Sequence, residues 1–174
     1  MGNRSGTRCQ TKLERRLTEI LRGELASHGI SFRRWKRSNA GEADFELSMI
    51  DIPRPRTPYA LGVAFHEMGH IHHCRNNGRY RTFPTYSMEY MAETYALEKL
   101  KMYGLPIMEY RAYATKYVLT CLAKYKNGGG DMNEVPAEIR RWAGVRLREW
   151  NAATYVTVRD RNVNKRGDIR VEYR

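Results

Sequence analysis

Apolar residues recur at helical spacing in several parts of the chain. The first such part runs from Thr11 to Ser27, where leucines and an isoleucine share one face and Gly29 follows as a stop signal. This pattern predicts an amphipathic N-terminal helix. Further helices are predicted where a proline or a serine precedes an apolar run, over 58–74, 88–103, 106–126 and 136–150.

Two segments between the first helices have the composition of strands. Ile30–Arg37 and Asp44–Ile52 contain β-branched or aromatic residues, and the turn-like residues 39–41 separate them. An antiparallel hairpin is therefore expected here, and a second hairpin is expected from Tyr155–Val158 and Ile169–Tyr173. Strands followed by helices indicate the α+β class. The 174 residues suit a single domain spanning 1–174.

The charge of the chain bears on its partners. Lysine and arginine total 31 against 19 acidic residues, a net charge of +12 that favours polyanions such as nucleic acid, and less specifically an acidic protein surface. Basic residues are spread widely, so a simple solvated surface remains an alternative. We expect basic terminal segments at about 1–10 and 151–174, and nucleic-acid contacts from Arg33, Arg34, Lys36, Arg37, Lys165, Arg166 and Arg170.

Cysteine usage and hydropathy indicate the compartment. Cys9, Cys74 and Cys121 form no CxxC pair and leave one residue over, which argues against a disulfide framework. The N-terminus, residues 1–22, is polar and charged, and no later stretch is apolar enough for a membrane span. We therefore expect a cytoplasmic protein with no membrane partner. The sequence does not indicate the oligomeric state.

The strongest chemical pattern is HEMGH at 66–70. It places His66 and His70 one helical turn apart on one face, where both imidazoles can reach one zinc ion, with Glu67 beside the metal. Zinc makes a water molecule acidic near neutral pH, and a nearby carboxylate can accept its proton and pass it to the leaving amine. Zinc is the expected cofactor, and hydrolysis of a peptide bond is the expected chemistry.

A zinc hydrolase needs a third protein ligand. His73 shares the face of His66, but about 10 Å of helix separates the two, too far for one zinc ion. The next predicted helix carries Glu89 and Glu93 one turn apart. Such glutamates often only solvate a surface, but the HEMGH sequence upstream favours a role at the metal.

At this point the sequence resembles the gluzincins, in which a helix with a glutamate ligand follows the HExxH helix. EYMAE, residues 89–93, is similar to their ExxAD pattern and differs in having Glu93 where aspartate or asparagine is commoner. The resemblance is closest to small ImmA/IrrE-type metallopeptidases and related phage or mobile-element proteins, over roughly Phe45–Leu100. It does not supply a substrate.

The resemblance implies a single zincin-like domain of the α+β class. In it, an N-terminal helix and a small antiparallel sheet precede an active-site helix, a third-ligand helix and further C-terminal helices. It implies zinc held by His66, His70 and Glu89, Glu67 as general base, and Glu93 orienting a histidine. By analogy, Met49–Ile52 would be the strand that pairs with an extended substrate.

Two functions follow as expectations. The first is a cytoplasmic zinc peptidase that cleaves a regulatory or DNA-associated protein. The second is a non-catalytic, zinc-containing module that binds nucleic acid or regulates, which the positive ends of the chain favour. An exchangeable water and a dependence on Glu67 separate the first from the second. A nuclease is less favoured, because no carboxylate-rich magnesium cluster lies outside this helix pair.

Overall fold

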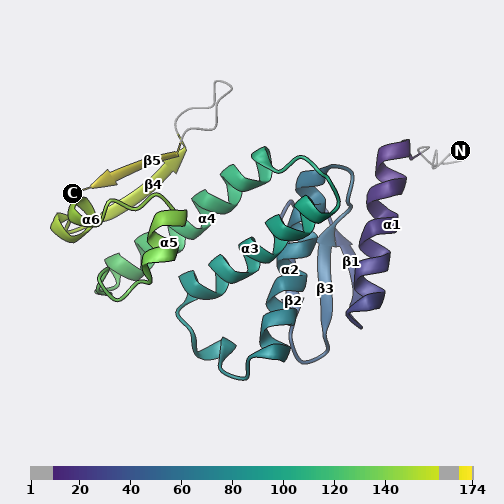
Figure 1. Ribbon diagram of the computed structural model, residues 1–174, viewed down its shortest axis with the longest axis horizontal. Helices are drawn as coiled ribbons and strands as arrows, with labels where there is room; N and C mark the ends of the chain where they lie inside the picture. The colour runs from purple at the N-terminus through teal and green to yellow at the C-terminus, as the bar shows by residue number, and fades with distance from the viewer. Residues whose placement is uncertain (1–9, 161–168, 174) are drawn as a thin grey trace, which may run out of the picture.

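A computed structural model describes residues 10–160 and 169–173 (Figure 1). The elements, in chain order, are α1 (Lys12–Ser27), β1 (Ser31–Lys36), β2 (Glu42–Asp44), β3 (Met49–Pro53), α2 (Pro58–Asn76), the 3-10 turn η1 (Tyr80–Thr82), α3 (Thr85–Met102), α4 (Met108–Asn127), α5 (Ala137–Trp142), α6 (Leu147–Ala152), β4 (Val156–Asp160) and β5 (Ile169–Tyr173). This mixture of helices and small sheets confirms the α+β class. None of the described helices is both long and apolar enough to cross a membrane.

The N-terminal helix forms as the sequence pattern predicts. Thr11 caps α1 by accepting a hydrogen bond from the Glu14 amide, and the Glu14 carboxylate accepts one from the Thr11 amide. The apolar face buries Leu17, Leu21 and Leu25 in the core. This face sets α1 against the sheet and α2 (Figure 1).

The three-stranded sheet is mixed, so the predicted antiparallel hairpin from Ile30–Arg37 and Asp44–Ile52 is wrong. The strand order is β1-β3-β2, with β1 parallel and β2 antiparallel to β3. The Asp44 carboxylate accepts hydrogen bonds from the amides of Glu46 and Leu47, and this turn divides the second predicted strand in two. The most apolar strand, β3, then takes the centre of the sheet.

A buried carboxylate joins the two parallel strands. Asp51 on β3 is fully buried and accepts hydrogen bonds of 2.9 and 2.8 Å from Arg33 and one of 3.0 Å from Arg34, both on β1. The hydrogen bonds from Arg33 hold the pKa of Asp51 at about 2, despite burial that raises it. Two of the arginines expected to contact nucleic acid therefore form ion pairs within the protein, while their side chains remain 41% and 68% exposed.

The strand that was expected to pair with an extended substrate is β3, and β3 is already paired on both sides. Met49–Ile52 lies between β1 and β2, so its main-chain groups serve the sheet and are not available to a peptide. That prediction is therefore wrong. Within the described residues, β2 pairs only with β3 and leaves its outer edge unpaired.

The long helix α2 lies at the centre of the fold. Every residue from Ala60 to Ile71 is buried, between the sheet on one side and α3 and α4 on the other. Gly69 permits the close approach of α3, because a Cβ there would lie 3.1 Å from the Cα of Ala92 and 3.2 Å from its carbonyl oxygen. Close packing of α2 and α3 is what brings side chains of the two helices to one point.

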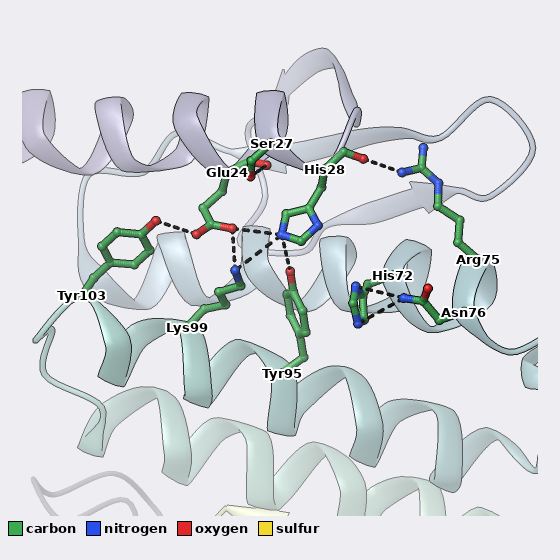
Figure 2. Close-up of polar contacts among 9 residues, drawn as sticks. All are labelled: Glu24, Ser27, His28, His72, Arg75, Asn76, Tyr95, Lys99 and Tyr103. Atoms are coloured by element: carbon green, nitrogen blue, oxygen red, sulfur yellow. Dashed lines mark hydrogen bonds and ion pairs between the residues drawn. The ribbon is translucent and has the colours of Figure 1, made fainter.

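A polar network fastens α1 to the C-terminal half of α3 (Figure 2). The buried Glu24 carboxylate accepts hydrogen bonds from Lys99, at 2.7 Å, and from the Tyr103 hydroxyl, and lies 3.3 Å from His28. Burial raises the pKa of Glu24, but these donors outweigh burial and leave it below its ordinary value. These contacts join residues of α1 to residues at the end of α3, and they stabilise the packing of the two helices.

The C-terminal part packs around a second group of buried side chains. Val118 and Leu122 of α4 contact a cluster that includes Trp150. The single helix predicted over 136–150 is two short helices, because Gly144 has a φ of +69° and ends α5 with a hydrogen bond from the Val145 amide to the Arg140 carbonyl. The C-terminal hairpin, β4 with β5, is confirmed.

Candidate metal centre

Two histidines of α2 point to one place. The helix begins where expected, with the Thr57 hydroxyl accepting a 3.1 Å hydrogen bond from the Ala60 amide. One turn separates His66 from His70, and their Nε2 atoms lie 3.0 Å apart. Both imidazoles are buried, at 8% and 9% exposure. The HEMGH helix therefore presents two nitrogen donors to a single point.

The carboxylate of Glu89 reaches the same point from α3. Its Oε2 atom lies 3.2 Å from the Nε2 atom of His66 and 3.3 Å from that of His70. These three residues form the one group of potential metal ligands found in residues 10–160 and 169–173. The structure thus brings together the three side chains that the sequence singled out.

The donor set is suited to a cation. Glu89 Oε2 and His66 Nδ1 are buried atoms without a well-directed hydrogen bond within the described part of the chain. A buried, unsatisfied carboxylate oxygen is costly unless a cation or a donor balances it. Two imidazole nitrogens with one carboxylate oxygen form a set that zinc accepts. His66, His70 and Glu89 can therefore hold a metal ion.

The proximity of these side chains raises the pKa of His66 and lowers that of Glu89. Burial lowers the pKa of His66, but the carboxylates of Glu89 and Glu93 outweigh it and raise that pKa to about 10. Burial raises the pKa of Glu89, yet the neighbouring imidazoles of His66 and His70 bring it down to about 2. Both shifts have one physical cause, the close packing of carboxylates and imidazoles at a single buried point.

Glu93 lies behind His66, one turn along α3 from Glu89. Its Oε1 atom is 3.3 Å from His66 Nδ1, and its Oε2 atom accepts a 2.6 Å hydrogen bond from the Tyr110 hydroxyl. Glu93 is fully buried. The Tyr110 ring fits there only because residue 62 is glycine, where a Cβ would lie 2.5 Å from the ring. This arrangement directs the Nε2 atom of His66 toward Glu89.

Tyr80 orients the imidazole of His70, a role that the sequence analysis did not predict. The Tyr80 hydroxyl donates a 3.0 Å hydrogen bond to the Met88 carbonyl, so it accepts the 2.7 Å hydrogen bond from His70 Nδ1. That leaves the His70 Nε2 lone pair free for a metal. The aromatic residue lies on η1, outside both motifs, and nothing in its local sequence marks this role.

His73 lies outside the group of ligands, as predicted, and so does His72. The Nε2 atom of His73 is 3.2 Å from the Met91 carbonyl, and its ring stacks on Tyr80. His72 contacts Asn76. Of the cysteines, Cys74 and Cys121 are free thiols, and Cys9 lies outside the described residues.

Glu67 lies between two cavities that reach the centre. A cavity of about 410 Å³ is lined by Ala43, Phe45, Glu67, His70, Arg81, Met88 and Glu89. A smaller cavity of about 130 Å³ is lined by Ala40, Gly41, Val63, His66, Glu67, Tyr110, Tyr113 and Tyr117. Burial raises the pKa of the Glu67 carboxyl above its ordinary value, although His66 and His70 act in the opposite direction. A carboxylate with a raised pKa is a better proton acceptor near neutral pH.

We predict that Tyr80→Phe weakens metal binding. The substitution keeps the ring but removes the acceptor of the His70 Nδ1 proton, and loss of such a partner costs roughly 10- to 100-fold in metal affinity. Competition titration against a chromogenic zinc chelator measures the change. Tyr90→Phe is the matched control, because Tyr90 packs its ring on Trp142, away from the ligands. Equal affinity in Tyr80→Phe and the wild type would contradict the orienting role.

No protein-family model, curated protein or solved structure matches this chain. The function must therefore be inferred from the side chains of the centre.

Proposed function

We propose that this protein is a zinc-dependent peptidase in which His66, His70 and Glu89 hold the metal and Glu67 is the general base. The observation that supports this most is the convergence of two Nε2 atoms and one carboxylate oxygen within 4.8 Å, beside a buried carboxylate and an open cavity. The proposed substrate is a peptide bond in a cytoplasmic, regulatory or DNA-associated protein.

The number of protein ligands favours catalysis over a structural role. Structural zinc sites use four protein ligands, whereas catalytic sites use three and keep one position for water. Within residues 10–160 and 169–173, only three side chains form the group. A zinc ion bound there would act as a Lewis acid and activate a water molecule. This supports the peptidase over the non-catalytic, zinc-containing nucleic-acid-binding or regulatory module.

The surrounding side chains have roles suited to hydrolysis. Glu67 would accept a proton from the attacking water and donate it to the leaving amine. Tyr113 and Tyr117 line the smaller cavity, and burial raises the pKa of both hydroxyls. Both therefore stay protonated at neutral pH and can donate hydrogen bonds to a substrate carbonyl. The resemblance of HEMGH and EYMAE to gluzincin motifs agrees with this proposal.

Metal analysis combined with a cleavage assay tests the proposal. The purified protein should contain about one zinc ion per chain, as expected for a single three-ligand site. A chelator should remove both the metal and the hydrolysis of a proteome-derived peptide library, and zinc should restore both. A tightly bound metal with no cleavage by the restored protein would favour the non-catalytic module, and absence of metal would reject both.

Gly41→Ala should impair catalysis without removing the metal. A Cβ at position 41 would lie 2.4 Å from both Cγ and Oε1 of Glu67, so the carboxylate must move. A displacement of about 1 Å at a reacting group costs about 100-fold in rate. The measurements are kcat on cleaved peptides and zinc content.

The control for Gly41→Ala is Gly23→Ala. Gly23 lies inside α1, and a Cβ added to it would meet no neighbouring atom within 4 Å, so alanine fits there without a clash. It should raise helix stability by about 0.5–1 kcal/mol and leave cleavage unchanged. Wild-type kcat in Gly41→Ala would show that Glu67 does not depend on this close contact.

A further inference from the structure

One face of α2 lines three successive cavities. Thr57 and Ala60 line the first, a cavity of about 560 Å³ at the N-terminal end of the helix. Val63, His66 and Glu67 line the second, and Glu67 and His70 line the third. The spacing of three or four residues keeps these positions on one side of the helix. The cavities therefore form a series along α2, with the metal ligands toward one end.

The chain from Trp35 to Phe45 lines the same cavities in the same order. Ser38 and Asn39 border the first cavity, residues 40–41 the second, and residues 43 and 45 the third. The three cavities thus lie in line between the same two walls, and we call this line of cavities the trough. From Thr57 to His70 the helix rises about 20 Å at about 1.5 Å per residue. An extended peptide covers that distance with about six residues.

The walls favour a polypeptide in the trough. Ala43 of β2 lines the third cavity, and within the described residues the outer edge of β2 is unpaired; such an edge can form main-chain hydrogen bonds with an extended peptide. A nucleic acid has no equivalent main chain for such pairing. The carboxylates of Glu67 and Glu89 line the third cavity, where they would repel a line of phosphates that continued along the trough from the first cavity.

The first cavity is strongly cationic. Its lining includes Lys36, Arg37, Arg54 and Arg56, and no acidic residue among those the structure describes. Lys36 lies 3.3 Å from Glu42 and Arg56 lies 3.7 Å from Glu14, both as partly exposed pairs. In the described parts of the chain, no carboxylate lies within ion-pair distance of Arg37 or Arg54. These two guanidinium groups are available to an anionic ligand.

The opposite end of the trough is also positive. The Arg81 guanidinium lies 4.9 Å from the centre of the Phe45 ring, at the border of the cavity that contains Glu89. Its contact with Glu46 is 3.8 Å long, and that carboxylate is 84% exposed. Such an exposed pair is weak and exchanges readily with a ligand. Cations therefore flank the metal centre on both sides.

We infer that the trough recognises an acidic polypeptide segment, with Asp or Glu side chains of the substrate bound in the cavity formed by Arg37 and Arg54. The inference rests on the proposed function, because the trough serves as a substrate site only if the metal centre hydrolyses peptides. Glu67 lies seven to ten residues from Ala60 and Thr57, about 10–15 Å along α2. The acidic side chains would therefore lie about three or four residues from the scissile bond.

A binding experiment tests the inference without turnover. In the Glu67→Gln background, fluorescence anisotropy measures the affinity for a fluorescein-labelled peptide with four consecutive glutamates. A peptide with four glutamines and an oligothymidylate with four phosphates are the comparison probes. The double variant Arg37→Ala/Arg54→Ala should bind the glutamate peptide about tenfold more weakly at low salt, and Arg37→Lys/Arg54→Lys should retain most of the affinity. The matched control is Arg15→Ala/Arg22→Ala, which removes the same charge from the exposed face of α1.

The outcomes separate this inference from the proposed function. Equal affinity for the glutamate and glutamine peptides, or equal losses in the two double variants, would overturn the inference. So would tighter binding of the oligothymidylate through Arg37 and Arg54, which would assign the cavity to nucleic acid. In the wild type, cleaved members of a peptide library should be enriched in Asp or Glu three or four residues from the cut. Cleavage without that enrichment rejects the inference and keeps the peptidase, whereas glutamate-peptide binding with no cleavage rejects the peptidase and with it the role of the cavity as a substrate site.

Discussion

Glu67→Gln should leave the metal in place and reduce peptide hydrolysis by roughly 100- to 10,000-fold. The glutamine amide has nearly the same shape as the carboxylate, so the helix and its ligands should not move. It cannot accept a proton from water, however, and general-base assistance is lost. Because the group of potential ligands excludes Glu67, zinc content should match that of the wild type. The measurements are kcat/KM on cleaved peptides and zinc per chain.

Two comparison variants distinguish the loss of the general base from the loss of the metal and from a simple change of charge. His66→Ala should lose both zinc and activity, because it removes a donor. Glu19→Gln changes an exposed carboxylate on α1 outside the ligand group, and should keep zinc and hydrolyse library peptides at close to the wild-type rate. Full activity in Glu67→Gln would reject the peptidase and leave the zinc-containing binding module as the better explanation.

Glu89→Gln should weaken zinc binding by more than roughly 100-fold. Loss of a residue that only orients a metal ligand typically costs roughly 10- to 100-fold in metal affinity, whereas Glu89 would itself be a ligand of the zinc ion. The substitution replaces a charged oxygen donor with a neutral amide and leaves two imidazoles. Competition titration measures the affinity. A second measurement is thermal unfolding, because a ligand that binds only the folded state raises stability as its concentration exceeds Kd. Added zinc should raise the Tm of the wild type much more than that of the variant.

Glu98→Gln is the matched control for that experiment. Glu98 lies on the same helix, α3, but is exposed and outside the ligand group. It makes the same change of charge and should retain wild-type zinc affinity and Tm response. An unchanged zinc affinity in Glu89→Gln would remove Glu89 from the ligand set and require a different third donor.

The local sequence was informative where a short pattern specifies a geometry. Thr11 and Glu14 form a capping box, and Thr57 with Pro58 begins α2 at the expected position. The spacing of His66 and His70 by four residues requires that they share a helical face. Helix ends were less well predicted, since α3 begins at Thr85 instead of 88.

Patterns that depend on distant partners were misjudged. Ile30–Arg37 and Asp44–Ile52 have strand-like composition, but nothing local shows that β2 would pair on the far side of β3. The 136–150 helix was predicted through Gly144, although a glycine with positive φ can end a helix.

Of the residues expected to bind nucleic acid, Lys165 and Arg166 lie outside the described residues, as do most of the residues expected in the basic terminal segments.

The sequence by itself determined the class of the fold, most of its helices and the chemistry available at the centre, because these depend on the order and type of neighbouring residues. Only the tertiary structure decided which side chains meet. Glu89 reaches His66 because Gly69 lets α3 approach α2, and Tyr80 reaches His70 across a turn. The trough likewise needs the chain before β2 to lie along α2. Packing between elements sets these contacts, and no local pattern encodes it.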